Sequence, residues 1–172
     1  LDPRGALPVL CYHGIVEEPS SEYEVSIEDF RAQMLELKRL GRNPITVSQL
    51  VRGLKGEARL PSSPVAITFD DGLRNLYTRA APILREFGWK ATAFMNPAYV
   101  GTKRLTWVEW RKLAAEGWDI QSHGLSHRRL TREAGEDQES YLAAVTEEMV
   151  GSKRKIGEGL GKKVDMLAYP YG

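Results

Sequence analysis

Two adjacent carboxylates, Asp70 and Asp71, have the residue types and spacing for chemistry on a bound cation. They follow an apolar run and precede Gly72, so they are expected at the end of a buried strand, where two carboxylates repel one another and lose water. A cation beside them removes that cost and divides them into one metal ligand and one free base. Because Asp-Gly is also a common turn pair, the motif alone has a purely structural interpretation as well.

The histidines His123 and His127 form the second candidate for metal chemistry. A spacing of four places both rings on one side of a helical turn, a usual arrangement for two ligands of one metal. The alternative is a pair of surface histidines in a polar loop. The chain has only three histidines, and two of them form this pair. Two imidazoles with one carboxylate leave positions open for water, which is typical of a catalytic site.

These side chains must be positioned by the elements that precede them, and apolar and amphipathic runs alternate along the chain. Strands are predicted over 9–12, 44–45, 65–69, 90–95, 119–121 and 164–168. Helices are predicted over 26–40, 46–54, 73–87, 106–117 and 138–156, with N-caps at Ser26, Thr46 and Thr106 and a break at Pro82.

Repeated strand and helix units indicate the α/β class, with a parallel sheet covered by helices. Either a (β/α) barrel or an open doubly wound sheet fits this pattern. In both folds functional groups gather at the carboxyl ends of the strands. The residues that fall there are His13, Asp70, Asp71, Ser122, His123, Pro170 and Tyr171.

Composition narrows the function classes. The 172 residues suit a single domain with a substantial core, and the formal net charge of +1, with both signs interspersed, disfavours nucleic acid as a partner. The single cysteine, Cys11, lies in an apolar run and is expected to be a buried thiol.

The segments Thr68–Gly72 (TFDDG) and Ser122–His127 (SHGLSH), with the run LTWVEWRKLAAEGWDIQSHGLSH, resemble the polysaccharide deacetylases, carbohydrate esterase family 4. The resemblance extends from about residue 9 to the end of the chain. It implies an irregular (β/α) barrel, incomplete here, since six strand candidates are few for a closed barrel. Residues 1–172 are accordingly expected to form a single deacetylase domain that lacks its C-terminal strands.

The resemblance also implies roles for the site residues. Asp71, His123 and His127 would hold a divalent metal, with zinc as the first choice and cobalt or nickel as alternatives. Asp70 would be the general base on a metal-bound water. The third family motif corresponds to Tyr169–Gly172, in which the backbone N–H of Tyr171 would bind the oxyanion and Tyr169 and Pro170 would border the substrate groove.

Two departures from the family pattern point to one subgroup. Ala168 stands where an arginine that contacts the base aspartate is expected, and the family's last motifs, which carry a histidine acid, are not found in the chain. The segment Leu10–Ile15 (LCYHGI) resembles deacetylases of poly-β-1,6-N-acetyl-D-glucosamine from biofilm systems, the intercellular adhesin deacetylase type. In that subgroup His13 would supply the acid that protonates the leaving amine. The alternative is a strand-end histidine satisfied by hydrogen bonds.

The expected substrate is therefore an N-acetylglucosamine polymer, bound along a groove with Tyr12, Asn96 and Trp107 among its lining residues. A monomer that is secreted or associated with the cell surface is expected. Two alternatives stay open: an N-deacetylase of peptidoglycan or chitin, and a catalytically silent carbohydrate-binding relative. Retention of both aspartates and both histidines argues against the silent relative, since the charged pair is costly without a metal.

Overall fold

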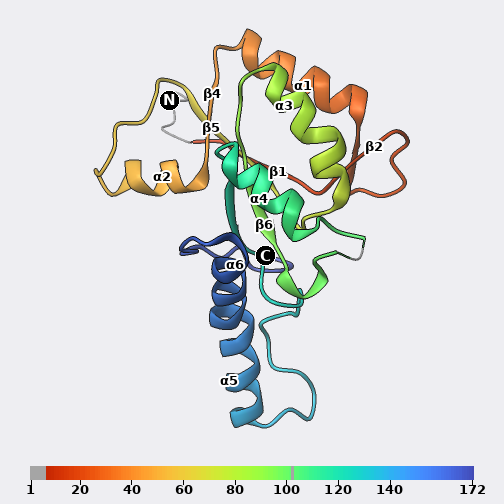
Figure 1. Ribbon diagram of the computed structural model, residues 1–172, viewed down its shortest axis with the longest axis vertical. Helices are drawn as coiled ribbons and strands as arrows, with labels where there is room; N and C mark the ends of the chain where they lie inside the picture. The colour runs from red at the N-terminus through yellow and green to blue at the C-terminus, as the bar shows by residue number, and fades with distance from the viewer. Residues whose placement is uncertain (1–6, 102) are drawn as a thin grey trace.

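A parallel sheet forms the centre of the computed structural model, which describes residues 7–101 and 103–172 (Figure 1). Its strands run in the order β1-β5-β6-β7, with β4 also paired to β5, and every pairing is parallel. The bounds are β1 Val9–Tyr12, β4 Asn43–Ile45, β5 Pro64–Phe69, β6 Thr92–Met95 and β7 Asp119–Ser122. The predicted α/β class is confirmed, and over the described ranges the sheet stays open, without closing into a barrel.

Strand β5 is the centre of the core. All six of its residues are buried, as expected for an apolar run in a parallel sheet that is covered on both faces. The register aligns the ends of neighbouring strands, with Tyr12 opposite Phe69 and Met95 opposite Ser122. The residues that follow these strands therefore emerge at one edge of the sheet.

Local signals in the sequence define the three helices α1 (Ile27–Arg39), α2 (Val47–Leu54) and α4 (Trp107–Ala115). The predicted N-caps are confirmed: Ser26 accepts from the backbone of the first turn of α1, and Thr46 and Thr106 form complete capping boxes. Helix α1 buries Phe30 and Met34 against the core.

Both long predicted helices are interrupted by π-helical turns. The helix predicted over 73–87 consists of a π segment, Leu76–Ala80 (η1), followed by α3, Ala81–Glu86. Pro82 lacks the N–H that a regular helix needs at that point, which accounts for the predicted break. The helix predicted over 138–156 consists of α5 (Gln138–Thr146), a π turn (η3, Glu147–Gly151) and α6 (Ser152–Leu160), and extends beyond the predicted end. Figure 1 shows this long helical unit reaching away from the sheet.

Three short elements differ from the prediction. Strands β2 (Gly14–Val16) and β3 (Glu24–Ser26) form a separate parallel pair, and Pro97–Tyr99 is a single 3-10 turn (η2). These elements are too short to produce a periodic pattern. The strand predicted over 164–168 is reduced to one parallel bridge between Leu167 and Ser122.

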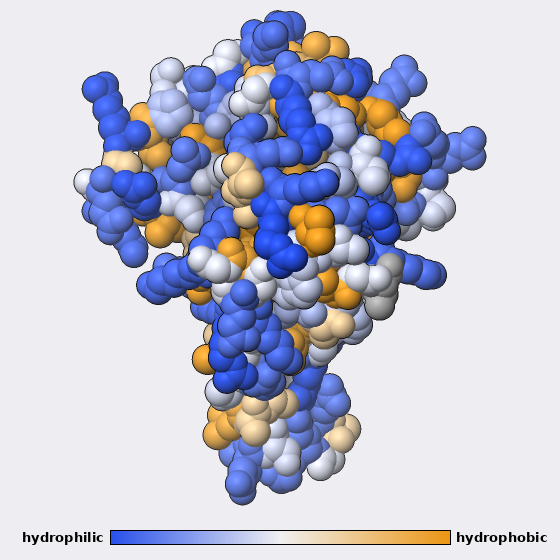
Figure 2. Space-filling view, viewed as in Figure 1, coloured by the Kyte–Doolittle hydropathy of each residue, from blue (hydrophilic) through white to orange (hydrophobic). Residues whose placement is uncertain are grey.

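On the face in Figure 2 hydrophilic side chains cover most of the surface, and apolar side chains form small separate patches. None of the helices in the described part of the chain has the length and apolar character needed to span a bilayer.

Candidate metal centre

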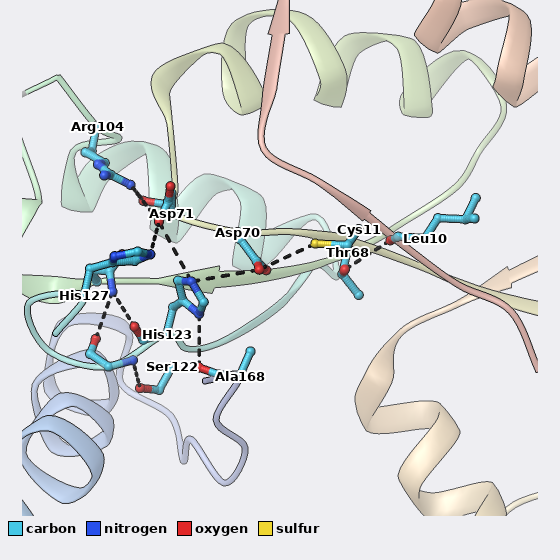
Figure 3. Close-up of polar contacts among 12 residues, drawn as sticks. Leu10, Cys11, Thr68, Asp70, Asp71, Arg104, Ser122, His123, His127 and Ala168 are labelled. Carbon is cyan, nitrogen blue, oxygen red and sulfur yellow. Dashed lines mark hydrogen bonds and ion pairs between the residues drawn. The ribbon is translucent and has the colours of Figure 1, made fainter. Parts of the chain in front are cut away.

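Asp71, His123 and His127 converge at the carboxyl edge of the sheet. One carboxylate oxygen and one ring nitrogen from each histidine lie within 4.8 Å of one another. Oδ1 of Asp71 lies 3.2 Å from Nε2 of His127 and 3.9 Å from Nε2 of His123 (Figure 3). One oxygen and two nitrogen donors in this arrangement match the ligand set of a catalytic divalent metal site with open positions.

The turn after β5 aims Asp71 at the histidines. Asp71 has a φ of 70° and Gly72 a φ of 66°, so two successive residues are left-handed. A Cβ atom at Gly72 would lie 2.5 Å from the Trp110 ring, so glycine is required here by both conformation and space. The turn interpretation of this motif is thus confirmed, and the same turn places the Asp71 carboxylate where the metal-site interpretation requires it.

His123 is fixed by backbone contacts on both sides. The backbone N–H of His123 donates to the backbone carbonyl oxygen of Met95 at 2.9 Å. The ring nitrogen Nδ1 of His123 lies 3.0 Å from the carbonyl oxygen of Ala168. Because a carbonyl only accepts, Nδ1 carries the proton and Nε2 presents its lone pair to Asp70 and Asp71. Burial lowers the pKa of His123 below its usual value, against the opposing effect of Asp70. The ring is therefore neutral, the form that binds metals.

The carboxylate of Asp71 has an unsatisfied atom. Oδ1 is buried and has no hydrogen bond within the described structure. Nη1 of Arg104 lies 3.4 Å from Oδ1 and donates instead to the backbone carbonyl oxygen of Asp71. A buried carboxylate oxygen without a donor is costly, and a cation between it and two imidazole lone pairs removes the cost. The residues present thus fit a divalent metal.

Glu148 holds the loop that carries His127. This glutamate, only 5% exposed, accepts hydrogen bonds from the backbone N–H groups of Leu125 and Ser126 and from the Ser126 hydroxyl. Asn96 supports the same loop from β6 by donating to the carbonyl oxygens of His123 and Gly124. These contacts fix where His127 stands relative to Asp71.

Backbone strain is concentrated at this edge. Within the described residues, four that are not glycine have a positive φ: Ser63, Asp71, His127 and Tyr171. Three of the four belong to the predicted site. Such conformations cost of order 1 kcal/mol or more each, and they tend to cluster where function requires them.

A cleft of about 690 Å³ opens beside the metal ligands, and Asp70 and His13 both line it. Its lining also includes Tyr23, Tyr169, Tyr171 and Arg129. The ring of Tyr171 lies 4.8 Å from that of His127, and the Arg129 guanidinium lies over Tyr171 at 4.1 Å. A second cleft, of about 850 Å³, follows residues 59–64, but only one charged side chain, Arg59, lines it. The first cleft is therefore the candidate for binding and chemistry.

Four residues predicted for the groove do not line this cleft. Tyr12 is buried, donates to Gln33 and stacks on Phe69, so it belongs to the core. Trp107 packs over Gly159 of α6. Asn96 and Pro170 are buried, Asn96 beneath the His123 loop as described and Pro170 against Gly124. Of the groove residues, the structure brings Tyr169 to the cleft, together with Tyr171.

Sequence reasoning missed four residues: Arg104, Glu148, Tyr23 and Arg129. Arg129 follows the second histidine by two positions, a proximity that could have indicated it. The other three come from segments with no recognisable motif. The prediction of a buried thiol at Cys11 is also wrong: the residue is exposed, and its Sγ lies 3.5 Å from Oδ2 of Asp70.

Comparisons with known proteins agree with this geometry. Residues 57–172 match the family described as polysaccharide deacetylase. The putative polysaccharide deacetylase YxkH of Bacillus subtilis (strain 168) is 30% identical over 167 residues, 96% of this chain and 57% of the relative. The poly-beta-1,6-N-acetyl-D-glucosamine N-deacetylase of Escherichia coli (strain K12) is 31% identical over 91 residues, 52% of this chain and 14% of that protein. The chain thus spans just over half of one relative and a small part of the other.

A solved structure, that of IcaB from Ammonifex degensii, superposes with a TM-score of 0.83 at 27% identity, over 96% of this chain and 74% of that chain. The shared fold thus extends over nearly the whole chain.

Proposed function

The chain belongs to the polysaccharide deacetylase family, and on that premise we propose that it hydrolyses the N-acetyl groups of poly-β-1,6-N-acetyl-D-glucosamine. The observation that carries the proposal is the shared cleft. Asp70, His13 and the three candidate metal ligands all line it. A base, an acid and a metal site at one opening are the groups that amide hydrolysis needs.

Asp71, His123 and His127 would hold the divalent cation, with zinc as the first candidate and cobalt or nickel as alternatives. When bound, the cation supplies Lewis acidity toward a water molecule and the acetyl carbonyl. The neutral His123 ring, held by Ala168, and the unsatisfied Oδ1 of Asp71 support this assignment.

Asp70 acts as the base. Its side chain is 15% exposed, and its Oδ2 lies 3.9 Å from Nε2 of His123, beside the metal site but outside the ligand set. It removes the proton from the water that attacks the acetyl carbon. The backbone N–H of Tyr171, in a left-handed turn at the cleft, donates to the oxyanion that forms.

His13 protonates the leaving nitrogen, so the products are acetate and a free amine. A ring nitrogen of His13 and a carboxylate oxygen of Asp70 lie within 4.8 Å of one another, close enough to serve the same acetamide. The exposed rings of Tyr23, Tyr169 and Tyr171 border the cleft and offer faces on which sugar rings stack. We propose that the protein acts as a monomer outside the cell or at its surface, where such a polymer occurs.

Acetate release from N-acetylglucosamine oligomers tests the function. The metal-loaded protein should release acetate from β-1,6-linked oligomers faster than from β-1,4-linked chitin oligomers, and a chelator should abolish the release. A preference for chitin or peptidoglycan fragments would assign the alternative deacetylase activity. Binding of oligomers without acetate release from any of them would instead indicate the silent carbohydrate-binding relative.

A further inference from the structure

Cys11, His13 and Asp70 form a second group of potential ligands beside the first. The thiol sulfur, a ring nitrogen of His13 and a carboxylate oxygen of Asp70 lie within 4.8 Å of one another. We propose that these three residues form a second, soft-metal site that binds Zn²⁺ and, by taking Asp70 and His13 as ligands, inhibits the enzyme. The inhibitory consequence rests on the proposed function, whereas the binding itself does not.

The fold places the three side chains together. Cys11 lies in β1 and His13 is the first residue after that strand, and their ligand atoms lie within 4.8 Å of one another. Strand β1 runs parallel to β5 with Cys11 opposite Thr68, which brings Asp70 alongside. In Figure 3 the Asp70 carboxylate lies between the Cys11 thiol and the His123 ring. Its Oδ2 is 3.5 Å from the first and 3.9 Å from the second.

The donor set is suited to zinc. Thiolate, imidazole and carboxylate are the three ligand types that zinc takes in proteins, and three of them leave a fourth tetrahedral position for water. The first site has only nitrogen and oxygen donors, so the sulfur distinguishes the second site and favours softer cations. Cys11 is exposed, so a cation reaches it from solvent.

The electrostatic environment also favours a cation. Cys11 is exposed to solvent on one side only, and partial burial of the thiol raises the pKa of Cys11 to about 11, with the charges of Asp70 and Asp71 acting in the same direction. The two neighbouring carboxylates, Asp70 and Asp71, give this edge of the sheet a negative potential that attracts a divalent cation. The second site is expected to bind metal more weakly than the first, because Asp70 Oδ2 must give up its bond from the Cys11 thiol, whereas Asp71 Oδ1 has no hydrogen bond to lose.

Asp70 cannot serve as a base and as a metal ligand at the same time. The first equivalent of zinc would fill the site of Asp71, His123 and His127 and support hydrolysis. A second equivalent of zinc would bind to Asp70 and His13 and stop hydrolysis. The protein would therefore be active at stoichiometric zinc and inhibited by excess zinc.

Cobalt titration tests the binding without any assay of activity. Co²⁺ is added to the metal-free protein in the presence of a non-thiol reductant. The first equivalent should give ligand-field bands alone, and a weaker second equivalent should add a thiolate-to-cobalt charge-transfer band. Cys11 is the single cysteine of the chain, so the origin of that band is unambiguous. Cys11→Ser should remove the band and weaken the second equivalent by at least about tenfold, as loss of even an outer partner of a ligand does. A single equivalent in the wild type, or a second one insensitive to Cys11→Ser, would overturn the proposal.

The inhibitory consequence is tested by acetate release at one equivalent of zinc and at excess zinc. Each variant is compared with its own rate at one equivalent. The wild type should lose activity in excess zinc, and Cys11→Ser should lose much less. Equal inhibition of the two would refute the regulatory role. If neither releases acetate while the cobalt titration shows two equivalents, the proposed function fails and the second site stands.

Discussion

Nδ1 of His123 lies 3.0 Å from the carbonyl oxygen of Ala168, in the motif position where an arginine was expected. The contact uses the backbone, so it does not depend on the side chain at position 168. It fixes the tautomer of His123 and turns Nε2 toward both aspartates. The aspartates themselves have other neighbours: the Cys11 thiol contacts Asp70, and the Arg104 guanidinium contacts Asp71. Within the described residues, the side-chain neighbours of the two aspartates thus come from other segments than the one that contains Ala168.

The substitution Asp70→Asn should abolish most turnover and leave the metal in place. An amide cannot accept the water proton, and loss of a general base typically costs about 10²- to 10⁴-fold in rate. The rate of acetate release and the metal content of the same sample should be measured together. Loss of the metal on this substitution would show that the roles of Asp70 and Asp71 are reversed.

Asp71→Asn should leave the metal-free protein as stable as before and should remove the stabilisation that the metal provides. Asparagine tolerates the left-handed φ of 70° and carries no charge, so the metal-free variant should be at least as stable as the metal-free wild type. The wild type should gain about 2.7 kcal/mol at a metal concentration 100 times Kd, and the variant should gain almost nothing. Thermal unfolding with and without zinc measures both quantities. An equal gain in the free energy of unfolding on adding zinc to the two proteins would show that Asp71 is not a metal ligand.

Glu148→Gln should loosen the loop that carries His127. The amide oxygen can keep the two backbone bonds that Oε2 accepts, but the negative charge that strengthens them is lost, and hydrogen bonds to an ionised acceptor are about twice as strong as neutral ones. Metal affinity should fall by about tenfold, as it does when outer partners of metal ligands are removed. Glu147→Gln is the matched control, since Glu147 is half exposed and its carboxylate pairs with the surface charges Arg154 and Lys155. A similar loss of affinity in both variants would contradict the role of Glu148.

Tyr12 should make the stability of the protein fall at high pH and should take no part in substrate binding. Burial raises the pKa of Tyr12 to about 12, from an ordinary value near 10. Between these values the folded protein holds more protons than the unfolded chain, so the free energy of unfolding falls as pH rises, by ~3 kcal/mol in total. Tyr12→Phe should remove this slope and lower stability at neutral pH by about 1 kcal/mol through loss of the bond to Gln33. Urea unfolding from pH 9 to 12 measures how steeply the free energy of unfolding falls with pH. A raised KM of the Tyr12→Phe variant for oligomers would show that Tyr12 contacts the substrate after all.

Local signals were sufficient for the elements that hold the site. The caps at Ser26, Thr46 and Thr106 and the apolar run of β5 were predicted because each depends on residues within one turn or one strand. The convergence of Asp70, Asp71 and the histidine pair followed from the parallel topology, in which strand ends share an edge.

The main error in the predicted site was the choice of which side chains of β1 face the core. The run Val9–Tyr12 is apolar throughout, so it gives no alternation from which to decide which side chains face the core. Cys11 was expected inside and Tyr12 in the groove, and the structure has them reversed. Arg104 and Glu148 were missed for a different reason. Their contacts with Asp71 and Ser126 join residues 33 and 22 positions apart, which only the folded chain brings together.

The distribution of left-handed residues has a practical consequence for engineering heat tolerance. Asp71, His127 and Tyr171 hold strained conformations that the site uses, so relaxing them risks its geometry. Ser63, with a φ of 46°, lies in the turn before β5, at the opposite end of that strand from Asp71, and it does not line the cleft beside the metal ligands. Replacing Ser63 with asparagine would favour that turn while leaving the catalytic edge untouched. Among the left-handed residues of the described structure that are not glycine, Ser63 is therefore the position where thermal stability can be raised without altering the proposed site.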